Sequence, residues 1–296
     1  MKMLICADGS DNSNIALDYG IYIAPKFNAT IAGIHVIDAS LIQGPLTTDI
    51  SGAVGMQPYD GFFEAIETSL KEKAQFILKD FQERCQKNGF AAEVKMTIGK
   101  IDQIIMEEAS SADLVIMAKK GEHFHLKEGG LLGTVAESVT RNCGKPVMVT
   151  PEKFQEIESM GIAFDGSTPA KKALKLSLEI SVQASWPLTV LMITADAKKA
   201  DNLCTEVEEL AEKCSADCEM VVLQGKESEE ILKFIRQGSV ELMVMGAYGH
   251  NRLRELFLGS TTTNTLSAKA LFRFCLHDSE TPNMTGAAEG VMNTFC

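Results

Sequence analysis

Short apolar runs alternate with amphipathic segments along most of the chain. The strand-like runs lie at 3–8, 31–37, 91–98, 114–117 and 146–149. Segments with apolar residues at helical spacing lie at 11–24, 62–85, 101–110 and 134–141. Because a strand, a helix and a strand in this order pair as a parallel unit, the pattern predicts an α/β fold. Residues 38–61, rich in Gly, Pro, Thr and Ser, depart from the pattern and predict a loop insertion.

The same order of elements then starts again. Strand-like runs at 160–165, 188–193, 219–223 and 241–245 repeat the first set. The turn Asp8-Gly9-Ser10 returns as Asp165-Gly166-Ser167, and Gly99-Lys100 returns as Gly225-Lys226. Such self-similarity indicates a duplicated domain. We expect a first repeat at 1–150, a linker at 151–159, a second repeat at 160–276 with its last strand within 271–276, and a disordered polar tail at 277–296.

The charge balance argues against two classes of partner. The 296 residues carry a net charge of −12, whereas nucleic acids and anionic membranes attract basic surfaces. The apolar run at 1–7 is too short for a signal peptide and Asp8 interrupts it. No stretch reaches the length of a membrane span. These features predict a cytoplasmic protein that binds neither nucleic acid nor membrane.

The cysteines and histidines give only weak indications of a metal. Eight scattered cysteines are typical of reduced thiols. Cys214 and Cys218 have the i,i+4 spacing of one helix face, but a buried or incidental pair is a better interpretation than a zinc site, because no histidine is near. His123 and His125 could ligate a metal in an extended loop, although a polar loop surface is the simpler interpretation.

The strongest candidate for a binding site is the stretch 241–265. A short buried strand ends in a glycine turn with the spacing Gly246-x2-Gly249-x9-Gly259-Ser260. The last two of these residues, followed by Thr261, would place free amides and hydroxyls at a helix N-terminus, where the helix dipole favours an anion. The spacing therefore predicts a phosphate site. The alternative is that these glycines only make turns and that Ser260 only caps a helix.

This loop resembles the nucleotide loop of the universal stress protein family, and both repeats are similar to domains of that family. The resemblance implies two tandem Rossmann-like domains of the adenine nucleotide alpha hydrolase type. Each would be a five-stranded parallel sheet with helices on both faces. ATP with magnesium would bind at the carboxyl ends of the strands. The resemblance also implies a pseudo-dimer of the two domains, and a homodimer of whole chains stays an open alternative.

The resemblance assigns roles to residues of the second repeat. Asp165 would contact the adenosine, Ile193 would offer backbone bonds to adenine, and Met245 would line the base pocket. The residues bordering the ribose and phosphates would be Gly246, Tyr248 and Gly249, and those holding the phosphates would be Gly259, Ser260, Thr261 and Thr262. Arg252 and Arg254 would either pair with the phosphates or lie on a solvated face.

In the first repeat the equivalent residues are Asp8, Val36, Met117, Gly121, Gly133 and Thr134. Ala118 stands where the second repeat has Gly246, and eleven residues separate Gly121 from Gly133 instead of nine. A methyl group there would crowd a close backbone approach. We therefore expect weaker binding, a different ligand or an empty first site. Lys119 and Lys120 could attract phosphate, but solvated lysines are the ordinary case.

Three functions follow from this sequence. The first is an ATP-binding regulatory or stress-resistance protein. The second is a slow ATPase or nucleotide hydrolase, although the sequence has no Walker lysine loop and no carboxylate or histidine placed to activate water, so no catalytic residue is assigned. The third is a dimerisation scaffold that binds no nucleotide, which the 246–260 pattern argues against.

Overall fold

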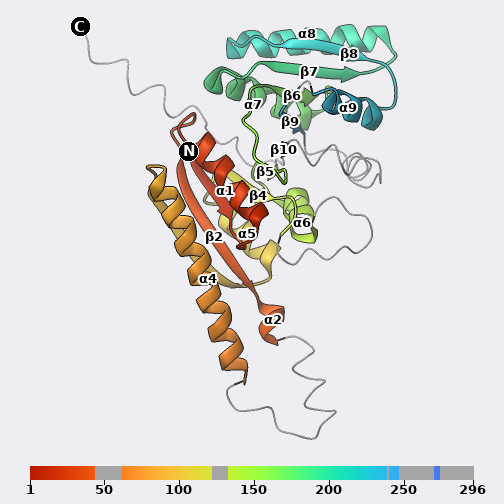
Figure 1. Cartoon of the computed structure of the whole chain (residues 1–296). Helices are drawn as coiled ribbons and strands as arrows, with labels where there is room; N and C mark the ends of the chain where they lie inside the picture. The colour runs from red at the N-terminus through yellow and green to blue at the C-terminus, as the bar shows by residue number, and fades with distance from the viewer. Residues whose placement is uncertain (44–61, 122–132, 239, 247–269, 274–296) are drawn as a thin grey trace, which may run out of the picture.

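One continuous sheet of ten strands runs through the molecule. The computed structural model describes residues 1–43, 62–121, 133–238, 240–246 and 270–273. The strands lie in the order β3-β2-β1-β4-β5-β10-β9-β6-β7-β8 (Figure 1). The predicted tail at 277–296 lies outside the described residues.

The first repeat is a five-stranded parallel sheet in the order 3-2-1-4-5. Its strands are β1 (Lys2–Cys6), β2 (Thr30–Asp38), β3 (Ala92–Gly99), β4 (Leu114–Ala118) and β5 (Val147–Thr150). Its helices are α1 (Asp11–Ile23), α2 (Ala39–Gln43), α4 (Phe62–Lys87), α5 (Ile101–Ala109) and α6 (Thr134–Asn142). The first residues of the loop insertion predicted at 38–61 are not loop, because β2 runs to Asp38 and the short helix α2 follows it. Residues 44–61 lie outside the described residues.

The second repeat has the same strand order, 8-7-6-9-10. Its strands are β6 (Met160–Ala163), β7 (Leu188–Ile193), β8 (Glu219–Leu223), β9 (Leu242–Met245) and β10 (Ala270–Arg273). Its helices are α7 (Thr168–Ala184), α8 (Ala197–Cys214) and α9 (Glu227–Arg236). All neighbouring strands within the repeat pair in parallel. The predicted α/β class with two parallel sheets is confirmed.

The last strands of the two repeats join the sheets. β10 pairs with β9 in parallel and with β5 in an antiparallel manner, with Phe272 opposite Met148. Because β5 and β10 run in opposite directions, the carboxyl ends of the two sets of strands face opposite edges of the combined sheet. The two predicted ligand sites therefore lie at opposite edges.

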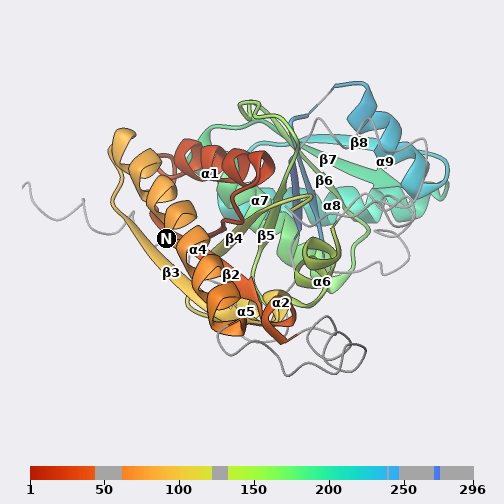
Figure 2. The same ribbon diagram turned by 60° about the horizontal axis from the view of Figure 1, so that its bottom comes forward.

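Helices cover both faces of the sheet (Figures 1 and 2). α1 and α4 pack on one face of the first repeat, and α5 and α6 pack on the other. In the second repeat α7 lies on β6 and β9 and contacts α8. α9 packs on the opposite face of the sheet, where its apolar residues form a core with residues of β7 and β9. The apolar residues under α1, α4, α7 and α8 form one core that spans both repeats.

Polar caps explain where several helices begin and end. The Ser10 hydroxyl accepts a hydrogen bond from the Ser13 amide at the start of α1, and Ser167 caps α7 in the same way, with a proline in the first turn. α8 ends at Cys214 because the next residue, Ser215, is left-handed with φ +50°. Cys218 therefore lies beyond the helix, and the prediction that it shares a helix face with Cys214 was wrong.

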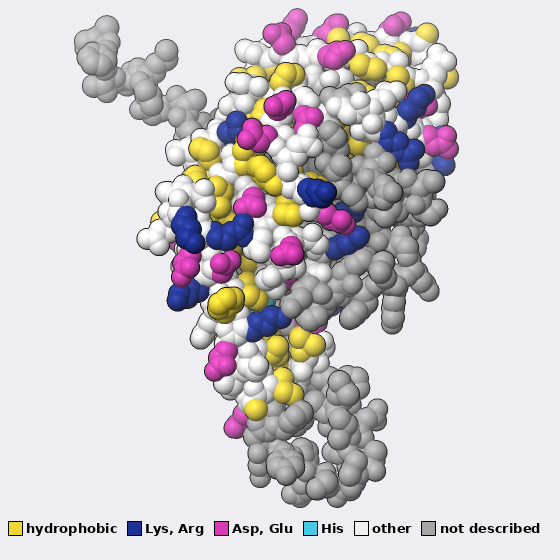
Figure 3. All heavy atoms as spheres, viewed as in Figure 1, with side chains coloured by type: hydrophobic (Ala, Val, Ile, Leu, Met, Phe, Trp, Pro, Cys, Tyr) yellow, Lys and Arg dark blue, Asp and Glu magenta, His cyan; other side chains and the backbone are white. Residues whose placement is uncertain are grey.

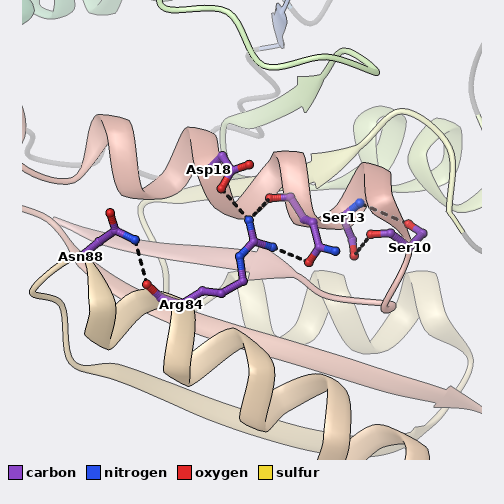
Figure 4. A network of polar contacts seen from close by, with 6 residues as sticks. Ser10, Ser13, Asp18, Arg84 and Asn88 are labelled. Carbon is purple, nitrogen blue, oxygen red and sulfur yellow. Dashed lines mark hydrogen bonds and ion pairs between the residues drawn. The ribbon is translucent and has the colours of Figure 1, made fainter.

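Arg84 ties the long helix α4 to α1 (Figure 4). Its guanidinium donates to the side-chain oxygen of Asn14 and forms an ion pair with Asp18, where N and O are 2.6 Å apart. Asn88 donates to the carbonyl of Arg84 one turn later (2.9 Å). These contacts hold α4 at a fixed position along α1, next to the turn that follows β1.

Aromatic residues join the two repeats on the α1 side. The rings of Tyr22 and Trp186 are stacked with centroids 6.2 Å apart, and Phe27 meets Trp186 edge-on. The Tyr22 hydroxyl donates to the Ile157 carbonyl in the linker (2.9 Å), and Phe154 of the linker packs against Tyr19. The linker is thus held against the first repeat.

The visible surface is mixed in charge. On the face shown in Figure 3, Lys and Arg side chains are interspersed with Asp and Glu, and the described part of this face carries no continuous basic patch. Among the described residues, none of the helices combines the length and the hydropathy needed to cross a bilayer.

Candidate functional site

Each repeat has a point where the strand order reverses, and the carboxyl ends of the strands at this point are called its crevice below. In the first repeat this point lies between β1 and β4, and in the second between β6 and β9. Open α/β sheets bind ligands at the carboxyl ends of such strands, because the flanking connections run to opposite faces and leave a gap. Asp8 follows β1, Gly121 follows β4 closely, Asp165 follows β6 and Gly246 follows β9 directly. The structure therefore places these predicted site residues at the crevices.

The Asp-Gly-Ser turn fixes a carboxylate at each crevice. Asp8 Oδ1 accepts hydrogen bonds from the Ser10 amide (2.9 Å) and the Ser10 hydroxyl (2.6 Å). Asp165 Oδ1 accepts from the Ser167 amide in the same geometry (3.0 Å). The intervening glycines have φ +84° and φ +80°, which residues with a Cβ rarely adopt. The repeated sequence therefore makes the same turn twice, and each turn holds a carboxylate next to the start of the following helix.

The predicted base-pocket residues share one face of the sheet. Val36 and Met117 contact the core under α5 and α6, and Ile193 and Met245 contact the core under α9. Val36 and Ile193 are partly exposed at the ends of their strands, whereas Met117 and Met245 are buried. An apolar floor beside a fixed carboxylate is suited to a flat ring attached to a sugar.

Gly246 lies against the backbone of its own repeat. A Cβ at this position would be 3.2 Å from the carbonyl carbon and oxygen of Pro169 and from the amide nitrogen of Ala170. The end of β9 therefore packs directly on the first turn of α7. Such a contact is tighter than most Cβ contacts, so the packing favours glycine here whether or not a ligand is present. The sequence indicates a close backbone approach at this glycine but not its partner, because the distance between β9 and α7 is a tertiary feature.

The loop of the first repeat is closed by backbone contacts. The Gly133 amide donates to the Lys119 carbonyl (2.9 Å), so the start of α6 lies beside the end of β4. A Cβ at Gly121 would be 2.5 Å from Asp8 Oδ2, so a side chain at this position would require that carboxylate to move. Gly121 therefore lies beside Asp8, and Gly133 and Thr134 at the start of α6 lie beside the residue that follows β4.

The two lysines of this loop differ from each other. Lys120 forms an ion pair with Glu152 (3.0 Å). Lys119 is only 3% exposed, and its Nζ has no hydrogen-bond partner among the described residues. Burial lowers the pKa of Lys119 to about 8; nearby Lys120 adds to this effect, whereas Glu152 opposes it. The interpretation of Lys119 as a solvated lysine was therefore wrong. Its spacing from Val115 and Met117, which are buried on the same face, is the signal that could have shown this.

Several predicted residues lie outside the described part of the chain. They are Tyr248, Gly249, Gly259, Ser260, Thr261 and Thr262, together with Arg252, Arg254, His123 and His125. Within the described residues, His, Cys, Asp and Glu side chains form no group of three or more that could hold a metal ion. The six described cysteines are free thiols, and burial raises the pKa of Cys85 to about 11 and also raises that of Cys143.

These features define a class of protein: a duplicated, doubly wound α/β protein with a crevice after the first strand of each repeat. The model of the universal stress protein family matches residues 1–151 and again 156–268. The chain belongs to this family, as the resemblance implied.

Two relatives and one solved structure show how far the likeness extends. A universal stress protein of Synechocystis sp. is 28% identical over 276 residues, which is 90% of this chain and 96% of the relative. One of Methanocaldococcus jannaschii is 34% identical over 157 residues, covering 52% of this chain and 84% of the relative. The crystal structure of a universal stress protein from Archaeoglobus fulgidus matches with a TM-score of 0.70 at 20% identity and covers 94% of this chain and 97% of that one. At this identity the structural match supports the fold alone.

Proposed function

We propose that the chain is a cytoplasmic, ATP-binding regulatory or stress-resistance protein that works as two domains, residues 1–150 and 160–276. ATP, accompanied by magnesium, binds mainly in the second domain. The observation that carries the proposal is the Asp165 turn at the β6–β9 crevice, followed in sequence by the Gly246-x2-Gly249-x9-Gly259-Ser260 pattern. Membership of the family supports it.

The chemistry of the crevice suits an adenine nucleotide. Asp165 is held by the Ser167 amide, so its second oxygen can accept a hydrogen bond from a ribose hydroxyl without reorganising the turn. Ile193 and Met245 offer apolar surface to a base. Beyond β9, glycines and hydroxyl residues at 246–262 provide amides and hydroxyls of the type that hold phosphates at helix N-termini.

The second domain is the better candidate for two reasons. Its loop keeps glycine where the first has Ala118, and it has nine residues between the glycines where the first has eleven. Because the two crevices face opposite edges of the sheet, a nucleotide in one domain does not touch the other. Any communication between them passes through the β5–β10 pair and the shared core.

The two equivalent aspartates offer a matched test. In Asp165→Asn the amide oxygen can still accept from the Ser167 amide, so the turn persists while the negative charge is lost; Asp8→Asn makes the same change in the first domain. We expect ATP with magnesium to bind the wild type and Asp8→Asn equally in calorimetric titration. Binding to Asp165→Asn should be weakened at least tenfold, as loss of a charged hydrogen bond predicts at about 1.5–3 kcal/mol. Circular dichroism checks that each variant is folded.

Each competing function has its own outcome in this test. Mass spectrometry of the denatured wild type identifies any nucleotide that copurifies, and a phosphate assay follows ATP over hours. Retained ATP without phosphate release supports the proposal, and steady release would make the protein an ATPase. If the wild type binds no ATP, or if Asp165→Asn binds it as the wild type does, the proposal is wrong.

A further inference from the structure

The turn that carries Asp165 packs against helix α8. Gly166, at the centre of this turn, has φ +80°. A Cβ at Gly166 would be 2.8 Å from Leu203 Cδ2 and 3.5 Å from Glu206 Oε2, so both of these α8 side chains lie directly against the turn. Leu203 is an apolar core residue, with 5% of its surface exposed. Glu206 differs from it, because it brings a charged group to the turn.

One oxygen of the Glu206 carboxylate is buried. Oε2 has no hydrogen-bond partner among the described residues, although 39% of the side chain as a whole is exposed. The Lys171 ammonium is 3.1 Å from this oxygen, which makes an ion pair without the alignment of a hydrogen bond. A buried carboxylate oxygen is costly in free energy unless a cation compensates it. Lys171 therefore stabilises the position of Glu206 against the turn.

Lys171 belongs to the first turn of α7. Its amide donates to the carbonyl of the N-cap residue, Ser167 (2.9 Å). The Ser167 amide in turn donates to Asp165 Oδ1 (3.0 Å). The ion pair thus joins α8 to the helix whose N-cap holds the Asp165 carboxylate. The partial positive charge at the N-terminus of α7 also favours a carboxylate at this place.

The first repeat holds its turn in an equivalent way with different residues. Asn14 has the position in α1 that Lys171 has in α7, because the amide of each donates to the carbonyl of its N-cap serine. Arg84 of α4 donates to the Asn14 side chain, and a Cβ at Gly9 would be 2.8 Å from the Ile77 side chain of the same helix. In both repeats, therefore, one helix packs on the glycine of the turn and makes a polar contact to the fourth residue of the helix that follows.

We propose that Glu206 is a positioning residue of the nucleotide site in the second domain. Paired with Lys171, it holds α8 against the turn, so that the Asp165 carboxylate stays in the orientation in which it accepts a hydrogen bond from the ribose. This inference rests on the proposed ATP site. It adds to that site a residue that acts through Asp165 and does not itself touch the nucleotide.

Glu206→Gln separates positioning from general electrostatics, because the two predict opposite results. The variant keeps the size of the side chain and loses a negative charge, so general electrostatics predicts tighter binding of the ATP anion. Positioning predicts that the affinity for ATP with magnesium, measured by calorimetric titration, is about fivefold weaker than in the wild type. Lys171→Met should show a similar loss, and the double variant should lose no more than either single variant, since all three remove one interaction. Lys175→Met is the control for net charge, because it breaks the ion pair with Glu179 one turn further along α7 and should bind ATP as the wild type does.

Hydrogen exchange of the Ser167 amide, followed by NMR, measures the turn without any ligand. Because this amide donates to Asp165, we expect it to exchange at least about threefold faster in Glu206→Gln and in Lys171→Met. The midpoint of urea unfolding should stay close to that of the wild type, since a partly exposed ion pair contributes little to global stability. Arg84→Met, which removes the contact in the first repeat, should leave the exchange of Ser167 unchanged.

The two measurements keep this proposal distinct from the proposed function. Unchanged exchange at Ser167 in both variants would overturn the proposal, and so would an affinity of Glu206→Gln for ATP equal to or above that of the wild type. If the wild type binds no ATP, the proposed function is wrong, whereas the exchange at Ser167 still decides whether Glu206 holds the turn.

Discussion

Replacing Lys119 with methionine should make the protein more stable. The change shortens the side chain by one atom and removes a buried charge that has no hydrogen-bond partner among the described residues. Burial lowers the pKa of Lys119 from 10.5 to about 8. Each unit of such a shift corresponds to about 1.4 kcal/mol, so burial of the charge costs the folded state about 3 kcal/mol at pH 7 as an upper bound. The uncharged methionine has no such cost of charge burial.

The gain should depend on pH in a defined direction. Between pH 8 and 10.5 the unfolded chain holds the Lys119 proton and the folded chain has released it, so the stability of the wild type rises with pH in this window. Below pH 8 the full cost is present. The advantage of Lys119→Met should therefore decrease from about 3 kcal/mol at pH 7 to about 1.5 kcal/mol at pH 9.5.

Urea unfolding, monitored by circular dichroism, measures the difference in stability between Lys119→Met and the wild type at pH 7 and at pH 9.5. Lys120→Met is the control, because it removes an exposed ion pair that contributes about 0–1 kcal/mol. If Lys119→Met is no more stable than the wild type at pH 7, Lys119 has a partner and the reasoning fails.

Three further changes test the fold around the crevices. Gly246→Ala should destabilise by about 1–3 kcal/mol in urea unfolding, because the new Cβ meets the backbone of α7 at 3.2 Å; an unchanged midpoint would disprove this packing. Gly166 and Gly89 have nearly the same positive φ, +80° and +83°, but a Cβ at Gly166 would be 2.8 Å from a leucine side chain of α8 whereas one at Gly89 would lie in open space. Gly166→Ala should therefore lower the free energy of unfolding more than Gly89→Ala does. Equal losses would show that only the backbone conformation matters. Tyr22→Phe should lower the free energy of unfolding by about 1 kcal/mol, because it removes the hydrogen bond to the Ile157 carbonyl. In urea unfolding, the fluorescence of Trp186 should change at the same midpoint as the circular dichroism signal. Two separate midpoints would show that the aromatic contact does not couple the repeats.

Local patterns were enough to find the elements and the duplication. The apolar runs at 188–193 and 219–223 coincide with β7 and β8. Such features depend on neighbours in the sequence. The repeated Asp-Gly-Ser turn indicated a shared geometry because glycine and a short polar side chain dictate that backbone.

Features that depend on distant contacts were not predictable in this way. The antiparallel pairing of β10 with β5 joins residues that lie more than a hundred positions apart. The tight packing of Gly246 on α7 and the burial of Lys119 under the α6 face likewise arise from tertiary packing. Two adjacent lysines in a loop are normally both exposed to solvent. Only the alternation of side chains along β4 indicates that Lys119 lies on the buried face.

Photo-crosslinking with 8-azido-ATP can locate the nucleotide on the chain. We expect peptides from residues 160–276 to carry the label, excess ATP to prevent the labelling, and Asp165→Asn but not Asp8→Asn to reduce it. Label confined to peptides from residues 1–150, or labelling that excess ATP does not prevent, would show that the second domain is not the nucleotide site.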